Sequence, residues 1–249
     1  FLSCALPLTL QQQIQRAGIA ILTTPSLDEG ELEDNASAVL NEVEQASHAA
    51  YCIALLDDMN DESIDILIVD HYQLSASFSN IMRSRCKHIV VIDDLANRQH
   101  DCDVILDQNL FEDFEFRYDQ LVPPHCQKLL GPEFAILRNE FYRPPSMPRN
   151  DNHILVCFGG SDPGNLTERV VDVLIELKSL TFSADIVVGA AYSGVNALKA
   201  KVECLTNAKL HVACTYISEL MKAANTMIGA GGSMHWERAA SGVAGIIIT

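Results

Sequence analysis

Short apolar runs that alternate with helical segments constrain this sequence more than any other feature. Runs rich in Val, Ile and Leu occur at residues 64–69, 88–92, 104–106, 154–158, 184–188, 209–212, 226–228 and 245–248. These runs are continuously apolar, which is typical of strands buried on both faces of a parallel sheet. Segments between them, such as 166–177 and 218–224, have helical spacing. Strands that alternate with helices predict an α/β fold.

A polar, proline-rich stretch divides the chain. Residues 143–151 read Arg-Pro-Pro-Ser-Met-Pro-Arg-Asn-Asp, a composition that continues neither a helix nor a central strand. A new strand–loop–helix pattern begins directly after it. We therefore predict two α/β domains, residues 1–145 and 146–249.

Both ends of the chain are apolar. Residues 1–10 lack a basic segment and a starting Met, so they resemble a strand more than a signal peptide. Residues 245–249 have the pattern of a buried strand that stops abruptly. We therefore expect both ends of the folded domains to be incomplete, with apolar surface exposed near residues 1–6.

Charge and cysteine spacing exclude several classes of function. The net charge of −16 is unlike that of a nucleic-acid-binding surface, which needs excess Lys and Arg. No window reaches the roughly 18 uncharged apolar residues of a membrane span. None of the eight cysteines forms a C-x-x-C pair, so we expect neither a zinc site nor another metal. We expect a monomer in the reducing cytoplasm, without a cofactor.

Two glycine-rich loops follow predicted strands of the second domain. The first spans residues 159–165 and includes Gly160, Ser161 and Asp162, and the second spans residues 229–233. Glycines let a ligand approach the backbone, and a helix N-terminus offers free N–H groups and partial positive charge. Both loops predict an anion site suited to phosphate. A plain strand-to-helix turn is the alternative for the first loop.

The second loop carries the more informative residues. Gly231 and Gly232 precede Ser233, which we expect to cap the following helix. Glu237 lies one turn later, where it could accept hydrogen bonds from ribose hydroxyls; a favourable interaction with the helix dipole is the alternative. Neither loop has the pattern of a P-loop or a G-x-G-x-x-G fingerprint, so a kinase or an NAD enzyme is unsupported.

Polar residues follow the predicted strands of the first domain. His71 is a candidate for proton exchange near neutral pH, although a structural histidine is the common alternative, and Tyr72 could hydrogen-bond a sugar or a water. Asp93 and Asp94 are adjacent and should point in opposite directions, so a glycosidase pair or metal site is disfavoured. We expect Asn109, after the next strand, to bind substrate.

Several stretches, taken in order, resemble the UDP-2,4-diacetamido-2,4,6-trideoxy-β-L-altropyranose hydrolases of pseudaminic acid synthesis. The matching stretches are residues 68–72, 91–98, 100–103, 107–110, 129–132, 135–138, 158–163, 229–233 and 236–238. The resemblance implies a GT-B fold, with two Rossmann-like domains facing a cleft. It also implies metal-independent attack of water at the anomeric carbon, with release of UDP.

The resemblance also assigns residues. It places Tyr72 near the reacting sugar, and Ser233 and Glu237 on the nucleotide. The family begins with a glycine-rich loop whose histidine positions the catalytic water, and this sequence has no counterpart of that loop. A GT-B glycosyltransferase that uses a UDP-sugar donor, and a UDP-binding module without catalysis, remain the alternatives.

Overall fold

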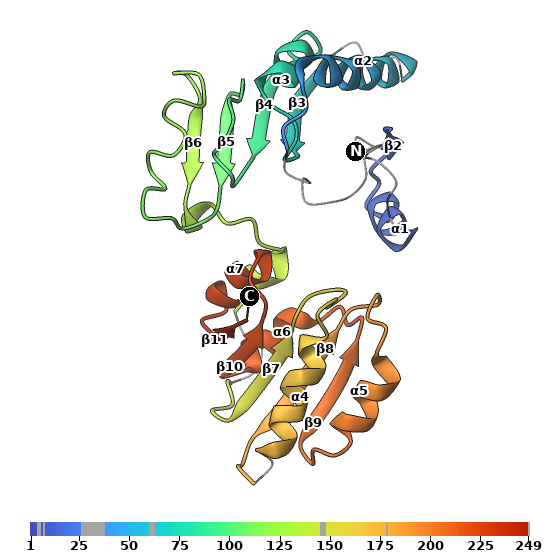
Figure 1. Cartoon of the computed structure of the whole chain (residues 1–249), viewed down its shortest axis with the longest axis vertical. Coiled ribbons are helices and arrows are strands. Elements are labelled where there is room, and N and C mark those ends of the chain that lie inside the picture. The colour runs from blue at the N-terminus through green and yellow to red at the C-terminus, as the bar shows by residue number, and fades with distance from the viewer. Residues whose placement is uncertain are drawn as a thin grey trace. The chain divides into compact units, whose positions relative to one another are not determined.

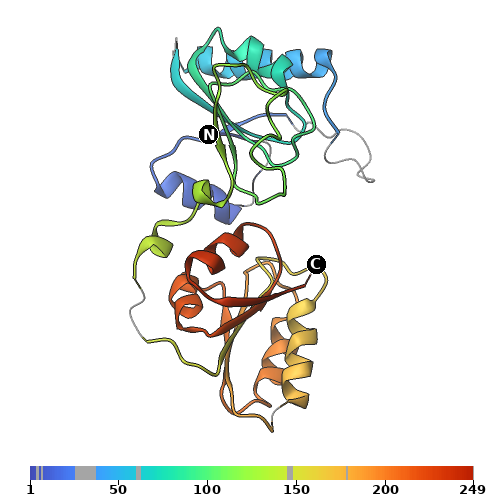
Figure 2. The same ribbon diagram turned by 90° about the vertical axis from the view of Figure 1, so that its left-hand side faces the viewer.

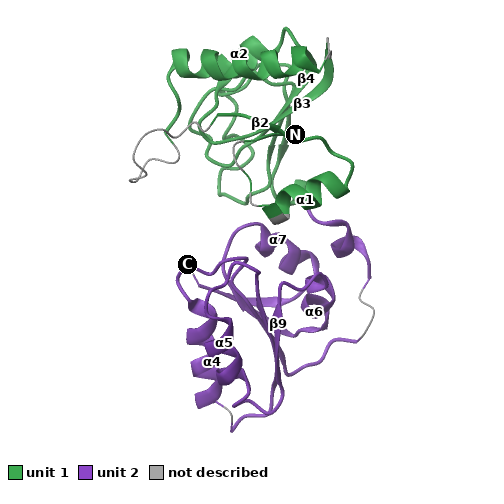
Figure 3. Cartoon of the chain, turned by 90° about the vertical axis from the view of Figure 1, so that its right-hand side faces the viewer, with its two compact units in different colours: residues 1–135 green, residues 136–249 purple. Residues whose placement is uncertain are grey.

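The computed structural model describes residues 1–3, 6, 8–25, 38–59, 63–144, 148–177 and 179–248. The chain forms two compact units, unit 1 at residues 1–135 and unit 2 at residues 136–249 (Figure 3). The expected boundary at 145/146 falls at residues 145–147, which lie outside the described residues. The observed division comes earlier because Leu137 and Phe141 pack into the core of unit 2.

Unit 1 is built on a parallel sheet of four strands in the order β3-β4-β5-β6 (Figure 1). Its strands are β3 (Ile64–Asp70), β4 (Cys86–Ile92), β5 (Val104–Asp107) and β6 (Gln127–Leu130). The helices of the unit are α1 (Leu8–Arg16), α2 (Glu42–Asp58) and α3 (Ala76–Met82), and β1 (Leu2–Ser3) pairs with β2 (Leu22–Thr23).

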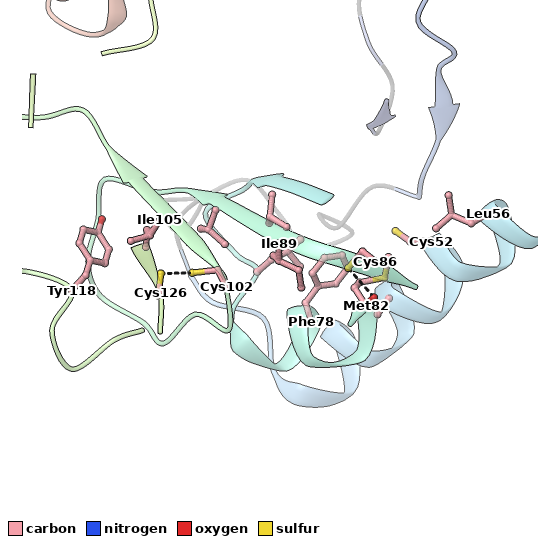
Figure 4. Packing of buried hydrophobic residues seen from close by; sticks show 14 residues of the cluster. Cys52, Leu56, Phe78, Met82, Cys86, Ile89, Cys102, Ile105, Tyr118 and Cys126 are labelled. Carbon is pink, nitrogen blue, oxygen red and sulfur yellow. Dashed lines mark hydrogen bonds between the residues drawn. The ribbon is translucent and has the colours of Figure 1, made fainter. Parts of the chain in front are cut away.

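Helices α2 and α3 provide much of the apolar core of unit 1. Figure 4 shows Cys52 and Leu56 of α2 and Phe78 of α3 in the buried cluster that also contains Ile89 of β4. Helix α2 starts with a capping box, in which Asn41 accepts from the Glu44 amide and the Glu44 side chain accepts from the Asn41 amide. This cap satisfies amides that would otherwise lack partners at the first turn.

Strand β3 stands at the edge of the unit 1 sheet. Its Ile66 and Ile68 side chains are 57% and 62% exposed, whereas Val69 is buried. The other side of β3 pairs with β4 along its length. Ile66 and Ile68 are two residues apart and point to the same face, so this face of the sheet carries exposed apolar side chains beside its edge.

Unit 2 contains a parallel sheet of five strands in the order β11-β10-β7-β8-β9. The strands are β7 (His153–Cys157), β8 (Ser183–Val188), β9 (Ala208–Val212), β10 (Thr226–Gly229) and β11 (Ala244–Ile247). The helices are α4 (Leu166–Glu176), α5 (Val195–Val202), α6 (Ile217–Ala223) and α7 (Ser233–Ala240). Short 3-10 turns lie at η1 (Pro132–Phe134) in unit 1 and η2 (Asn139–Tyr142) in unit 2.

The chain of unit 2 starts in the middle of its sheet and winds outward twice. From β7 it runs to β8 and β9 on one side, then crosses to β10 and β11 on the other. Helices α4 and α5 pack on one face of the sheet, and α6 and α7 on the other (Figure 2). This is the Rossmann-type order, and its switch point lies between β7 and β10.

The strand pattern of the sequence is confirmed, with small differences at the ends. All eight predicted strands are present as β3, β4, β5, β7, β8, β9, β10 and β11. The strand expected over residues 1–10 is wrong in extent, since Leu2–Ser3 is the strand and a helix begins at Leu8. Phe1 is 59% exposed, as expected of this end.

Glycine at position 229 is a packing requirement of the sheet. A Cβ atom on Gly229 would lie 2.3 Å from the carbonyl oxygen of Cys157 on the neighbouring strand. We expect Gly229→Ala to lower the free energy of unfolding by about 1–3 kcal/mol, because the strands must separate. Urea unfolding followed by fluorescence of Trp236, the single tryptophan, measures the change. Gly231→Ala, whose Cβ meets no atom of the described residues within 4 Å, is the control; equal losses would contradict the prediction.

Candidate functional site

Both glycine loops start at the switch point of the unit 2 sheet, at the carboxyl ends of β7 and β10. In open α/β sheets this is where ligands bind. The two strands are hydrogen-bonded neighbours with Gly229 opposite Cys157. The loops therefore emerge side by side, as the sequence predicted.

The glycines of these loops fall into two groups. Gly159 and Gly232 have φ of 92° and 87°, a backbone conformation that favours glycine. Gly160 and Gly231 have ordinary φ, and a Cβ on either would meet no atom of the described residues within 4 Å. Neither backbone conformation nor packing requires glycine at these two positions. The open space beside them is what a bound phosphate needs for contact with backbone N–H groups.

The two helix N-termini at the switch point differ in charge. Asp162 accepts from the amides of Leu166 and Thr167, at 2.9 and 2.8 Å, and so caps α4 with a carboxylate. Both oxygens of Asp162 therefore serve the helix, and a contact of Asp162 with a ligand stays a prediction. Ser161 is exposed and free to face a ligand, whereas Thr167 is fully buried. A diphosphate is disfavoured beside the Asp162 carboxylate.

Helix α7 lacks such a cap. Its N-cap residue is Gly232, which has no side chain, and Ser233 is the first helical residue. The expectation that Ser233 caps the helix is therefore wrong, because the loop ends one residue earlier. The first-turn amides of α7 remain available to an anion, together with the positive end of the helix dipole. Of the two loops, the second is therefore the better candidate for a phosphate site.

Glu237 is buried and paired with an arginine. Its residue is 8% exposed, and its two oxygens accept from Nε and Nη2 of Arg138 at 2.7 and 2.9 Å. The hydrogen bond to Glu237 is the main cause of a raised Arg138 pKa. Arg138 precedes η2 and its side chain is 49% exposed. The prediction from the sequence placed Glu237 open to a ligand and did not include its ion pair with Arg138.

In unit 1 the residues expected at the site lie on adjacent loops. Tyr72, Asp94 and Asn109 follow β3, β4 and β5, which are neighbours in the sheet. The Asn109 amide nitrogen Nδ2 donates to Asp94 Oδ2 at 3.2 Å. Tyr72 is 49% exposed, and the charge of Asp94 is the main cause of its raised pKa. The structure thus brings Tyr72 and Asn109 to one carboxylate.

His71 is held by the turn that follows β3. Its Nδ1 accepts from the Gln73 amide at 3.1 Å, and its carbonyl oxygen accepts from Arg98. A neutral imidazole that accepts at Nδ1 carries its proton on Nε2. In this arrangement Nδ1 is already occupied and a neutral ring would carry its proton on Nε2, which disfavours the role of proton acceptor that the sequence suggested.

Asp93 holds these loops in position through buried contacts of its carboxylate. Its carboxylate lies 2.7 Å from Arg98 Nη1, and accepts from the Tyr118 hydroxyl at 2.8 Å and the Ala96 amide at 2.9 Å. Burial acts to raise the pKa of Asp93, but the nearby His100, the Ala96 amide and the Arg98 charge outweigh it, so the pKa lies well below its ordinary range. Asp93 is therefore a buried, charged anchor.

Asp107 fixes the next loop in the same way. It accepts from the Asn109 amide at 2.9 Å and from Arg117 Nη1 at 2.5 Å. Arg117 also donates to the main-chain oxygen of Asp94 and lies 3.7 Å from the ring centre of Phe111. Burial raises the pKa of Asp107. Arg117 thus connects the loops of β4 and β5.

The sequence reading missed the anchoring roles of Arg98, Arg117 and Tyr118. Arg98 lies in a stretch that carries the family resemblance, five residues after Asp93, which is the one available signal. Arg117 and Tyr118 lie in an acidic, aromatic segment without strand or helix periodicity. Among the described residues no group of three His, Cys, Asp or Glu side chains could hold a metal ion. No helix within the described residues is long and apolar enough to cross a membrane.

Replacing Asp93 tests its role as an anchor. We expect Asp93→Asn to destabilise unit 1 by about 3–5 kcal/mol at neutral pH, because it leaves Arg98 charged and buried. The carboxylate stabilises the fold fully above the ordinary aspartate pKa of about 3.9 and progressively less as the pH falls below it, so the difference from wild type should shrink in acid.

Urea unfolding followed by circular dichroism, at neutral pH and at about pH 3, measures both effects. The exposed Glu115→Gln is the control for loss of one acidic charge in the same unit. A difference that grows in acid would contradict the assignment.

Comparison with known proteins gives two curated relatives, whereas no protein-family model matches the chain. The chain is 25% identical over 181 residues to the UDP-2,4-diacetamido-2,4,6-trideoxy-β-L-altropyranose hydrolase of Campylobacter jejuni, covering 72% of this chain and 64% of that protein. It is 26% identical over 208 residues to an uncharacterized protein of Methanocaldococcus jannaschii, covering 78% of this chain and 42% of that protein. The chain spans less than two thirds of these relatives.

Among solved structures the chain is similar to MurG of Acinetobacter baumannii. The TM-score is 0.55 at 13% identity, over 99% of this chain and 69% of that protein, a likeness that concerns the fold alone. Together with the Rossmann-type order of unit 2, it confirms the GT-B type of α/β fold. The chain is thus a GT-B-type protein whose sequence resembles a UDP-sugar hydrolase, as the motifs predicted.

Proposed function

We propose that this chain binds the UDP part of a nucleotide sugar through unit 2 and takes part in hydrolysis of a UDP-linked diacetamido-trideoxy sugar, in pseudaminic acid biosynthesis. The observation that carries the proposal is the glycine loop before α7, at the switch point of the unit 2 sheet. The loop before α7 offers open space at Gly231 and an uncapped helix terminus. The similarity to the Campylobacter hydrolase supports the choice of reaction.

In the proposed reaction, water attacks the anomeric carbon and the bond from that carbon to the diphosphate oxygen breaks. Negative charge develops on the departing UDP, and the water gives up a proton. Backbone N–H groups of the loop before α7 would stabilise the charge on the diphosphate, as preformed dipoles do in other enzymes. The step needs no metal ion, because the helix terminus and the amides supply the electrostatic stabilisation.

Unit 1 contributes positioning rather than proton abstraction. The raised pKa of Tyr72 keeps its hydroxyl protonated at neutral pH, so it would orient the sugar or a water. His71 presents a donor at Nε2. We therefore assign neither side chain as the acceptor of the proton that the attacking water gives up, and that proton passes to the surrounding water.

One alternative stays open from the sequence. A glycosyltransferase that passes the sugar from a UDP-sugar donor to an organic acceptor is the second candidate. Release of UDP and free sugar in water alone supports hydrolysis. Turnover only with an added acceptor supports transfer, and binding of UDP without either reaction supports a binding module.

The loop before α7 can be blocked without disturbing the fold. Gly231→Ala places its Cβ where no atom of the described residues lies within 4 Å. We expect UDP affinity, measured by titration calorimetry, to fall about tenfold or more, because the side chain keeps the diphosphate from the backbone. The unfolding midpoint should stay near that of wild type. Unchanged UDP affinity would place the nucleotide elsewhere.

Glu237 tests the ribose contact. We propose that its carboxylate, oriented by Arg138, accepts hydrogen bonds from the ribose hydroxyls. Glu237→Gln should weaken UDP binding about tenfold, because a charge-assisted hydrogen bond is lost. Glu140→Gln removes the other carboxylate near Arg138, at 3.5 Å, and serves as the control. An equal effect of both substitutions would mean that the charge around Arg138 matters rather than a contact of Glu237.

A further inference from the structure

Two cysteines of unit 1 meet where strands β5 and β6 begin. The Sγ atoms of Cys102 and Cys126 lie 3.5 Å apart, a contact that the dashed line between them marks in Figure 4. Cys102 lies two residues before Val104, the first residue of β5, and Cys126 directly precedes Gln127, the first residue of β6. The pair therefore lies at the amino ends of these parallel strands, opposite to the polar loops that follow them.

Main-chain hydrogen bonds hold the two cysteines in this position. The Gln127 amide donates to the Asp103 carbonyl oxygen at 2.8 Å, which joins the residues that follow the two cysteines. The Cys126 amide donates to the Pro123 carbonyl oxygen at 2.9 Å. The Asp103 carboxylate in turn accepts from the Ile89 amide of β4 at 2.7 Å. Both cysteines thus belong to segments that are fixed to the sheet, which keeps their sulfur atoms close together.

The distance between the sulfurs suits formation of a bond. A disulfide brings the two sulfur atoms from 3.5 Å to about 2.05 Å, a movement of about 1.5 Å. Neither cysteine has to leave its segment for this, because the sulfurs are already in contact. Intramolecular reactions between groups held in this way are strongly favoured over reactions between separate molecules.

The two thiols differ in exposure and in acidity. Cys102 is fully buried, whereas Cys126 is 9% exposed. The hydrogen bond with Cys102 is the main cause of a lowered Cys126 pKa, and the same bond, together with burial, raises the pKa of Cys102. The thiolate is the reactive form of cysteine. Exposure and acidity therefore both select Cys126 as the thiol that reacts first.

We propose that Cys102 and Cys126 form a redox-active dithiol that a small peroxide oxidises to an intramolecular disulfide, with Cys126 as the attacking thiol and Cys102 as the resolving thiol. The inference is independent of the proposed function, since it needs neither a nucleotide nor unit 2. A small oxidant suits the site because little of Cys126 is exposed. The disulfide closes a ring around residues 103–125, the segment that carries Arg117 and Tyr118.

The reaction consumes one molecule of hydrogen peroxide for each pair of thiols. The Cys126 thiolate attacks one peroxide oxygen, the O–O bond breaks, and hydroxide leaves and takes up the proton that Cys126 released. The product is a sulfenic acid on Cys126. The Cys102 sulfur attacks the sulfur of this acid, the S–O bond breaks, and the hydroxyl group leaves as water with the proton of Cys102. The two sulfurs lose two electrons, and the peroxide is reduced to two molecules of water.

Oxidation of the full chain with hydrogen peroxide tests the pair. After free thiols are alkylated in denaturant, cleavage after Arg98, Arg117 and Lys128 places the two cysteines on separate peptides. We expect mass spectrometry to detect these two peptides joined, lighter than their sum by the mass of two hydrogen atoms, and separated again by reductant. Cys86 is the matched control, because it is 8% exposed in the same core and should stay alkylated.

Two single variants test the order of the steps. In Cys102→Ala we expect peroxide to leave Cys126 as a sulfenic acid that dimedone captures, because the resolving thiol is gone. In Cys126→Ala we expect Cys102 to stay reduced, because it is fully buried. The control Cys86→Ala removes a thiol of similar burial and should still form the disulfide.

The wild-type result decides the inference even where a variant fails to fold. Linked peptides from the native chain support it. Thiols of Cys102 and Cys126 that stay reduced while the exposed Cys204 is oxidised overturn it, and they would mean that the pair only fills the core. Linkage that forms only in the urea-unfolded chain, or equally between other pairs of cysteines, also overturns it, because the native geometry is then not the cause.

Discussion

The loops of unit 1 depend on one buried negative charge. Asp93 is almost completely buried, so its negative charge is stabilised by the surrounding protein groups rather than by water. Those partners come from different segments: Arg98 from the same loop, which also holds the main chain after β3, and Tyr118 from the segment before β6. A single carboxylate therefore fixes several loops at once, and through them it fixes the positions of the polar side chains that the loops carry.

In unit 2 the loops are positioned in a different way, by the order of the strands in the sheet. The chain leaves β7 in one direction and returns to β10 beside it, so two loops distant in sequence emerge together. The two loops are not equivalent, because one helix is capped by the carboxylate of Asp162 and the other has Gly232, which lacks a side chain, as its N-cap residue. Backbone geometry makes both helix N-termini suitable for an anion, and the negative charge of Asp162 disfavours anion binding at the N-terminus of α4.

Strand positions could be predicted from the sequence because a strand buried on both faces must be continuously apolar, as residues 154–157 show. The place of the glycine loops followed from the same pattern. The capping role of Asp162 is local, since Leu166 and Thr167 lie four and five residues further along the chain, whereas the pairing of Glu237 depends on a partner that only folding brings to it. Arg138 lies 99 residues from Glu237, and no local pattern joins them. The short β6 was missed because its Gln127 and Lys128 are polar and exposed.

The exposed edge of β3 has a consequence for the behaviour of the chain in solution. Among the described residues β3 pairs with β4 alone, so its outer edge offers main-chain groups for pairing with another copy, beside the exposed side chains of Ile66 and Ile68. The net charge of −16 opposes such contact through mutual repulsion between chains. Colloidal stability is therefore electrostatic, and it is lost as the solution approaches the isoelectric point near pH 4.7 or as salt screens the charge.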